Sequence, residues 1–125
     1  MGKKEVSLSS DKLSQLIVKG MQDKKALDIQ VLDLRKVNNA VADFFIVCTG
    51  SSNTHMQGIS EAIQEEVHKI TQDNPWHKEG SDNKSWVVLD YVDVVSHIFT
   101  KDAREFYRIE DLWADAKITK VEETA

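Results

Sequence analysis

The sequence predicts a single α/β domain in which a mixed β-sheet is flanked by helices. Two runs, 44–49 and 86–99, are largely apolar and rich in β-branched and aromatic residues, as strands are. Two others, 10–21 and 53–70, carry apolar residues at helical spacing. These segments follow one another along 125 residues, a length that suits one domain with one core. We therefore expect the order helix, strand, strand, helix, strand, strand, strand, helix.

The first helix is predicted from residue 9 onward. Ser9 and Ser10 are good N-cap residues, and Asp11 adds a negative charge to the first turn. The apolar residues that follow form one stripe, at positions i, i+3, i+4 and i+8: Leu13, Leu16, Ile17 and Met21.

Two strands are predicted next, over 28–34 and 44–49. The first alternates only approximately, with Ile29, Val31 and Leu34 as its apolar residues. The second is apolar without alternation, as a strand covered on both faces of a sheet would be. We expect the two strands to be neighbours in one sheet.

Gly50, Ser51 and Ser52 form a turn that closes the second strand. Ser51 or Ser52 can cap the helix that follows, because serine is a favoured N-cap residue. The apolar residues of that helix keep helical spacing: Met56, Ile59, Ile63, Val67 and Ile70. We predict that the three turn residues are structural and that they end the strand and cap the helix.

The second half of the chain predicts three strands and a short helix. A short strand is expected over 76–80 and a loop over 80–83. Two further strands are expected within 86–99, around a turn at 90–92. Thr100 can cap a short helix, and one or two more helical turns follow.

The domain is expected to begin and end where these patterns fade. We predict a flexible N-terminus over 1–8, a single domain over 9–114 and a flexible C-terminal tail over 115–125.

Composition and charge narrow the class of protein. The chain has 41% hydrophobic and 30% charged residues, and no apolar run approaches the ~20 residues that span a bilayer. Its net charge of -5 argues against DNA binding through a basic surface and favours a basic partner. Cys48 is the single cysteine and lies in an apolar run, so we expect a buried thiol and no disulfide framework. We expect a cytoplasmic protein that does not associate with membranes.

The sequence gives little support for catalysis or metal binding. Asp90 and Asp93 are three residues apart, so on one strand they point to opposite faces and in a hairpin they flank the turn. Neither arrangement gives the close carboxylate pair of a two-metal site. The turn at residues 50–52 lacks the second glycine of a Gly-x-Ser-x-Gly elbow, and the four histidines lack metal-ligand spacing. We therefore expect no catalytic residue, no metal and no cofactor.

Aromatic residues and one histidine are better candidates for a binding surface. His97 interrupts an apolar strand, so its ring is either satisfied by a neighbour or exposed on a binding face. Aromatic residues gather in the second half: Trp76, Trp86, Tyr91, Phe99, Tyr107 and Trp113. Tryptophan and tyrosine often anchor interfaces, but ordinary core packing explains each of them about equally well.

Several motifs occur in order over residues 10–114 and together resemble one family. They are Asp28-Ile29 with Leu32-Asp33-Leu34, the segment 43–55, Trp76 with Glu79-Gly80, the segment 86–99, and Arg104 with Tyr107, Glu110 and Leu112-Trp113. On these residues the chain resembles the ribosomal silencing factor family, also called iojap-like.

The resemblance implies a fold similar to that of nucleotidyltransferases, without their catalytic residues. It implies a factor that binds the large ribosomal subunit through large-subunit ribosomal protein fourteen, sterically blocks the small subunit and so represses translation. It also implies a homodimer when free, and organelle relatives are linked to large-subunit assembly. The chain departs from the family pattern at Val92, where relatives commonly have Gly, and at Ser96, where they commonly have Val. Because valine is poorly suited to positive φ, the first departure predicts a rebuilt turn.

Polar residues that punctuate the last hairpin are the first candidates for the partner surface. The candidates in the hairpin are Trp86, Asp90, Asp93 and His97, and those beyond it are Tyr107, Glu110 and Trp113. The acidic pair is expected to meet basic side chains. A different function, a nucleotide-binding or nucleotidyl-transferring enzyme, stays open as the alternative.

Overall fold

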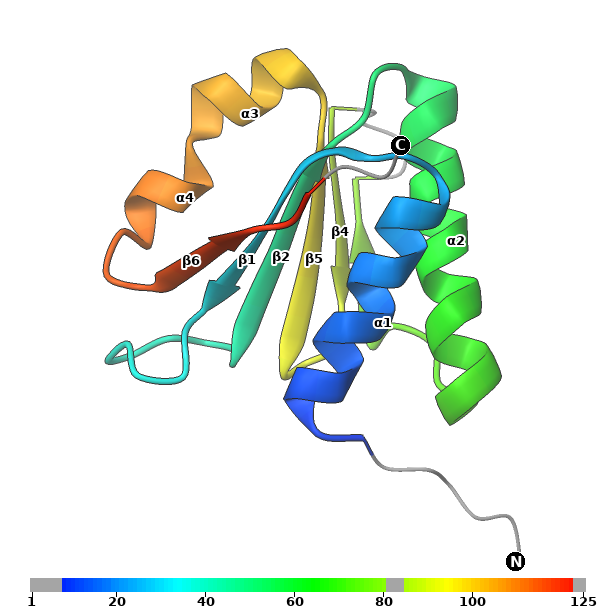
Figure 1. Cartoon of the computed structure of the whole chain (residues 1–125). Coiled ribbons are helices and arrows are strands. Elements are labelled where there is room, and N and C mark those ends of the chain that lie inside the picture. Colours follow the sequence, from blue (N-terminus) through cyan, green and yellow to red (C-terminus); the bar gives the residue numbers. More distant parts are fainter. Residues whose placement is uncertain (1–7, 81–84, 123–125) are drawn as a thin grey trace, which may run out of the picture.

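A six-stranded mixed sheet forms the middle of the molecule, with helices on both faces (Figure 1). The computed structural model describes residues 8–80 and 85–122. Its elements are α1 (Ser10–Asp23), β1 (Leu27–Asp33), β2 (Phe44–Thr49), α2 (Asn53–Thr71), β3 (His77–Glu79), β4 (Trp86–Asp90), β5 (Val94–Phe99), α3 (Lys101–Tyr107), α4 (Ile109–Leu112) and β6 (Lys117–Lys120). The predicted α/β class with a mixed sheet is confirmed.

The strand order in the sheet is β3-β4-β5-β2-β1-β6. The central strands β2 and β5 run parallel, and the other neighbouring pairs are antiparallel. Every residue of β2 and of β5 is buried, which explains why their sequences are apolar with little alternation. The predicted adjacency of the first two strands is confirmed by the pairing of β1 with β2.

Helices α1 and α2 cover one face of the sheet and pack closely against each other (Figure 1). Ser9 caps α1 by accepting a hydrogen bond from the N–H of Lys12. A Cβ on Gly20 would lie 2.7 Å from the Cα of Ile63, so glycine is what lets the two helices approach. The main core lies between these helices and the sheet and includes Ile17, Met21, Ile46, Ile59, Ile63, Leu89 and Ile98.

The opposite face of the sheet is covered less completely, by the short helices α3 and α4 (Figure 1). A smaller core forms there: Leu32, Leu34, Phe45, Val47, Val95, Phe99, Ala103 and Ile109. Trp86, Val88 and Trp113 pack against this core and stay partly exposed. The aromatic side chains proposed as binding residues therefore belong largely to this second face.

The predicted C-terminal tail differs from the structure, because residues 117–120 form β6. This strand pairs with β1 from Gln30 to Asp33 and so supplies partners for backbone groups that an edge strand would leave open. All four of its residues are exposed, so the sequence has no apolar pattern that would predict this strand. Val121 then packs against the main core. Residues 1–7 of the predicted flexible N-terminus and residues 81–83 of the predicted loop lie outside the described residues.

The turn between β4 and β5 contains a backbone conformation that is unusual for its sequence. Val92 has φ +78°, contrary to the expectation that the turn avoids a positive φ at this valine. The N–H of Asp93 donates to the carbonyl of Tyr91 at 3.0 Å, which makes a γ-turn centred on Val92. The Val92 N–H donates to Asp90 Oδ1 at 2.7 Å, which holds the strained turn in place.

Candidate functional site

An aromatic cluster lies on the second face of the sheet, where β4, β5 and α3 meet. Trp86 is opposite Phe99 in the β4–β5 register, and their rings stack with centroids 4.9 Å apart. Tyr107 of α3 lies with its ring centroid 4.6 Å from that of Trp86. His97 completes the cluster, with its ring edge-on to Phe45 at 4.7 Å. We call Trp86, His97, Phe99 and Tyr107 the aromatic face.

His97 is buried and neutral within this face. Trp86 Nε1–H donates to His97 Nδ1 at 3.1 Å, so the ring proton of a neutral His97 is on Nε2. Nε2 has no partner among the described residues, and the residue is only 5% exposed. Burial lowers the pKa of His97 to about 4, which keeps the imidazole uncharged near neutral pH. Of the two roles left open by the sequence, the structure supports a ring satisfied by its neighbour at one nitrogen.

Exposed apolar side chains extend this surface along α3 and α4. Phe106 is 78% exposed, Tyr107 is 44% exposed and Leu112 is 76% exposed. Phe106 and Tyr107 contact each other edge-on, with ring centroids 5.0 Å apart. Large apolar side chains that gather on neighbouring turns, next to a half-buried tryptophan, are typical of protein-binding surfaces. Phe106 and Leu112 were not among the predicted site residues, because exposure is a property of the packing of α3 and α4.

Glu110 and Trp113 anchor the two short helices to the sheet. Glu110 accepts a hydrogen bond from Arg104 Nε at 2.8 Å, and Arg104 donates through its other arm to Thr49 Oγ1 at 2.9 Å. Trp113 packs edge-on against Phe45, with ring centroids 5.8 Å apart. Their main observed contacts are therefore internal. Trp113 is linked to the aromatic face through Phe45, whose ring contacts that of His97.

Asp90 and Asp93 lie at the far end of the hairpin from Trp86. Asp90 is bonded to the Val92 N–H, and the Asp93 carbonyl accepts from the N–H groups of Asp43 and Phe44. The carboxylate of Asp93 is exposed and makes no ion pair with a described residue. The structure thus brings Trp86, His97 and Tyr107 together and places the acidic pair elsewhere.

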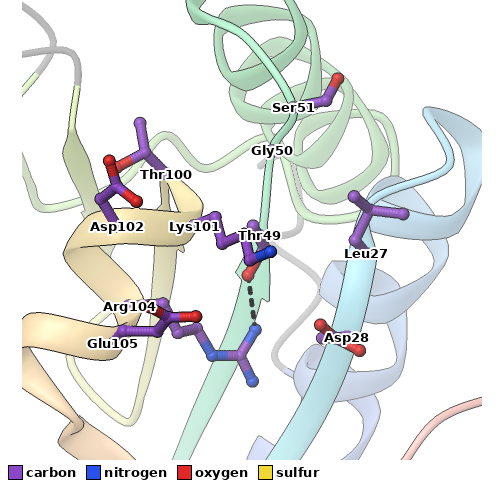
Figure 2. A pocket seen from close by; sticks show the side chains of 10 residues that line it. All are labelled: Leu27, Asp28, Thr49, Gly50, Ser51, Thr100, Lys101, Asp102, Arg104 and Glu105. Carbon is purple, nitrogen blue, oxygen red and sulfur yellow. Dashed lines mark hydrogen bonds between the residues drawn. The ribbon is translucent and has the colours of Figure 1, made fainter.

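A polar pocket of about 700 Å³ opens at the carboxyl ends of β2 and β5 (Figure 2). This is the edge at which open α/β sheets commonly bind ligands. Figure 2 shows Arg104 reaching Thr49 while Asp102 and Glu105 lie on the α3 side. Asp28, Asp102 and Glu105 are negative, whereas the positive groups are Lys101 and Arg104, and Arg104 is already paired with Glu110. The lining therefore offers phosphate oxygens one cation without an ion pair to a described residue, Lys101, and its described carboxylates do not gather closely enough to hold a metal ion.

The turn at residues 50–52 has structural contacts. Ser52 is the N-cap of α2 and accepts from the N–H of His55 at 3.0 Å. Ser51 lies beside His55, whose Nδ1 is 2.8 Å from the Ser51 nitrogen and 3.0 Å from Ser51 Oγ. The other ring nitrogen of His55 is 2.7 Å from the carbonyl of Lys24. A Cβ on Gly50 would lie 2.5 Å from Met56 Cγ, so the turn fits against the first turn of α2.

Sequence reasoning did not identify His55 as the partner of this turn. Its position three residues after the N-cap, where a side chain can reach back toward the turn, is the signal that could have found it. Within the described ranges, no three His, Cys, Asp or Glu side chains gather closely enough to hold a metal ion. Over the same ranges, no helix is both long and apolar enough to cross a membrane.

Comparison with known proteins places this architecture in a family. The family model described as "Ribosomal silencing factor during starvation" matches residues 7–125. The chain belongs to this family. The resemblance drawn from the sequence motifs is therefore confirmed, and the chain is a member of a group of ribosome-associated regulators of translation.

Individual silencing factors are similar over nearly their whole length. The chain is 36% identical to ribosomal silencing factor RsfS of Halalkalibacterium halodurans over 118 residues, which cover 92% of this chain and 97% of that protein. It is 37% identical to the Bacillus subtilis factor over 100 residues, 80% of this chain and 83% of that protein. A crystal structure of a Chromobacterium violaceum protein is similar with a TM-score of 0.80 and 29% identity, covering 94% of this chain and 97% of that one.

A mitochondrial relative carries the ribosomal large subunit in its name. The mouse protein "Mitochondrial assembly of ribosomal large subunit protein 1" is 26% identical over 100 residues, which cover 78% of this chain and 43% of that protein.

Proposed function

We propose that this silencing factor binds the large ribosomal subunit through its ribosomal protein fourteen and sterically prevents the small subunit from joining. Translation is then repressed by occupancy of the subunit surface. Family membership supports the ribosome as the target, and the name of the mouse relative supports the large subunit. The finer choice of ribosomal protein comes from the family resemblance of the sequence motifs.

The observation that carries the proposal is the aromatic face with its exposed extension. Trp86 is held by Phe99, Tyr107 and the hydrogen bond to His97, so its position is fixed before any partner arrives. A rigid aromatic anchor loses little conformational entropy on binding. Tryptophan and tyrosine are also the residues that most often dominate interface energy. We propose Trp86 and Tyr107 as the central contacts, with Glu110 and Trp113 supporting them.

Charge favours the same partner class. The net charge of -5 can steer the protein toward a surface rich in lysine and arginine and so raise the rate of encounter. Asp90 and Asp93 contribute to this field at the end of the hairpin. We propose that the free protein is a cytoplasmic homodimer and that its dimer surface overlaps the ribosome-binding surface.

Steric blocking requires no catalytic group. The pocket of Figure 2 is the position where a nucleotide enzyme would be sought, and its three carboxylates do not gather closely enough to hold the metal ion of a nucleotide complex. The serine turn beside it is engaged with His55 and the start of α2. These observations support a binding protein over the nucleotidyl-transferring alternative.

Sedimentation with isolated large subunits tests the proposal directly. We expect stoichiometric co-sedimentation and a loss of joined ribosomes in proportion to occupancy. Tyr107→Ala should weaken binding of the large subunit by about fivefold to thirtyfold, on the order of 1–2 kcal/mol, because it removes an interface aromatic. Ile70→Ala is a matched control, since Ile70 is 42% exposed and lies on α2, on the other face of the sheet.

Three outcomes would contradict the proposal. The first is that substoichiometric protein abolishes subunit joining, which would indicate turnover. The second is that the protein binds small subunits only. The third is that Tyr107→Ala and Ile70→Ala behave alike, which would move the interface away from the aromatic face.

A further inference from the structure

A second concave surface lies at the opposite end of the hairpin, between the β4–β5 turn and the ends of α1 and α2. Its volume is about 350 Å³. The residues that matter to its chemistry are Leu13, Asp73, Trp76, Tyr91, Val92 and Asp93. In Figure 1 this turn lies at the end of the sheet next to the start of α1. None of these residues belongs to the aromatic face, and we call this surface the turn groove.

Trp76 is the most exposed of the three tryptophans. It is 75% exposed, although its backbone is fixed by a hydrogen bond from its N–H to the Asp90 carbonyl at 2.8 Å. An indole on a fixed backbone that is left open to solvent offers a flat surface for a cation or an aliphatic chain. Core packing does not explain this tryptophan.

The groove also contains polar groups without partners. Asp73 and Asp93 are exposed, and neither forms an ion pair with a described residue. The Tyr91 hydroxyl is buried beside them and lacks a hydrogen-bond partner among the described residues. Burial first and the Asp73 charge second raise the pKa of Tyr91, so its hydroxyl stays protonated. A buried hydroxyl without a partner costs free energy, and this one has no accessible surface of its own in the groove.

The backbone strain of the γ-turn is located at this groove. Val92 lines the groove with φ +78° and a side chain that is 56% exposed. A positive φ is unfavourable for a β-branched residue, and strained residues of this kind gather at binding sites. An exposed valine in a strained turn contributes little to the core, which makes a contact with a partner the simpler explanation.

We propose that the turn groove binds an arginine side chain presented by a basic segment of a partner protein. The aliphatic part of the arginine packs on Trp76 and Leu13, and the guanidinium lies between the carboxylates of Asp73 and Asp93. Arginine fits better than lysine because its planar head can stack on an indole and donate to two carboxylates at once.

Several observations select this occupant. Two carboxylates without ion pairs to described residues favour a cation, the exposed indole favours a planar one, and the apolar floor favours a methylene chain behind the charge. An acidic or wholly apolar segment would leave the two carboxylates facing like charge or no charge. The inference stands apart from the proposed ribosome binding, because it concerns a groove outside the aromatic face and a ligand that can be tested alone.

A titration of the full chain with N-acetyl-arginine amide, followed by NMR, tests the groove without a partner protein. We expect saturable shifts of the Trp76 indole N–H and of the backbone amides of Asp73 and Asp93, at millimolar ligand. N-acetyl-citrulline amide has the same shape without the charge. We expect it to bind more weakly, by up to about fivefold for each of the two ion pairs that it cannot form.

Variants then separate a groove from general attraction to an acidic protein. Asp93→Asn should weaken arginine binding about threefold to fivefold, whereas Asp102→Asn removes one exposed charge elsewhere and should leave it unchanged. Trp76→Ala should abolish saturation. The amide spectrum of each variant confirms that it is folded.

Three results would overturn the inference. One is equal affinity for the arginine and citrulline amides. Another is a set of shifts that stays linear with ligand or spreads over acidic residues outside the groove. The third is equal weakening by Asp93→Asn and Asp102→Asn.

Discussion

Replacing Val92 by glycine should stabilise the protein. A left-handed conformation costs a side-chain-bearing residue ~1–2 kcal/mol, and Val92 holds it with φ +78° at the centre of a γ-turn. Glycine removes that cost but increases the entropy of the unfolded chain by ~0.5–1 kcal/mol. Little burial is lost, because the Val92 side chain is already 56% exposed. The net expectation is a gain of about 1 kcal/mol in the free energy of unfolding.

Urea denaturation measures this gain as a higher midpoint with an unchanged m-value. In a thermal melt the same gain corresponds to a rise of about 3–6 °C. Val41→Gly is the matched control, because Val41 is 77% exposed and is not among the positive-φ residues. We expect that control to be destabilising by ~0.5–1 kcal/mol. If both variants lost stability equally, the strain argument would be wrong.

Three further predictions concern stability. Ser52→Ala removes the cap of α2 and should lower the free energy of unfolding by about 1 kcal/mol, which lowers the melting temperature by several degrees. A nucleotide-binding assay should give the same result for this variant as for the parent. Ser96→Ala should gain about 1 kcal/mol in urea unfolding, because Ser96 is 0% exposed and its hydroxyl has no partner among the described residues. Stability should fall between pH 6.5 and pH 4, by up to about 3 kcal/mol, because the unfolded chain protonates His97 more readily than the fold does. Protonation would also place an Nδ1–H opposite the Trp86 N–H that donates to it. In His97→Gln, the free energy of unfolding should change less with pH between pH 6.5 and pH 4.

The elements that the sequence predicted well are those whose side chains face a core. Strands β2 and β5 are buried along their whole length, so the apolar character of residues 44–49 and 94–99 is enough to identify them. Helices α1 and α2 show their buried stripe at helical spacing. Strand β6 was not predicted, because it forms through backbone pairing with β1 and exposes all its side chains. No periodicity of side chains records a strand of that kind.

The candidate site was only partly predictable, for a related reason. Trp86 and His97 meet because Val88 is opposite His97 in the β4–β5 register, and the geometry of a single turn sets that register. The contact between Arg104 and Thr49 joins residues far apart in the chain, which spacing rules do not detect. Asp93 was recognised as a site residue, whereas its neighbours in the turn groove, Asp73 above all, come from a different part of the chain.

The two surfaces lie toward opposite ends of β4 and on opposite faces of the sheet: the aromatic face lies toward α3, and the turn groove lies toward α1 and α2. Trp86 and Asp90 stand at the two ends of β4, roughly 13 Å apart at the usual rise per residue of a strand. A standard interface covers about 800 Å² on each partner and spans a larger distance than that. A basic protein docked on the aromatic face would therefore reach the turn groove only by extending around the end of the sheet.

The affinity of the large subunit for Tyr107→Ala, for Asp93→Asn and for the double variant can be measured by co-sedimentation. These affinities show whether the ribosome occupies both surfaces or whether a second protein occupies the turn groove. If the ribosome fills both surfaces, each single change weakens co-sedimentation and the two free-energy losses add, because the sites share no contacts. If the groove belongs to another protein, Asp93→Asn leaves co-sedimentation at the parent level while still weakening the arginine amide. In that case one acidic chain would join a basic protein to the ribosomal surface that it blocks.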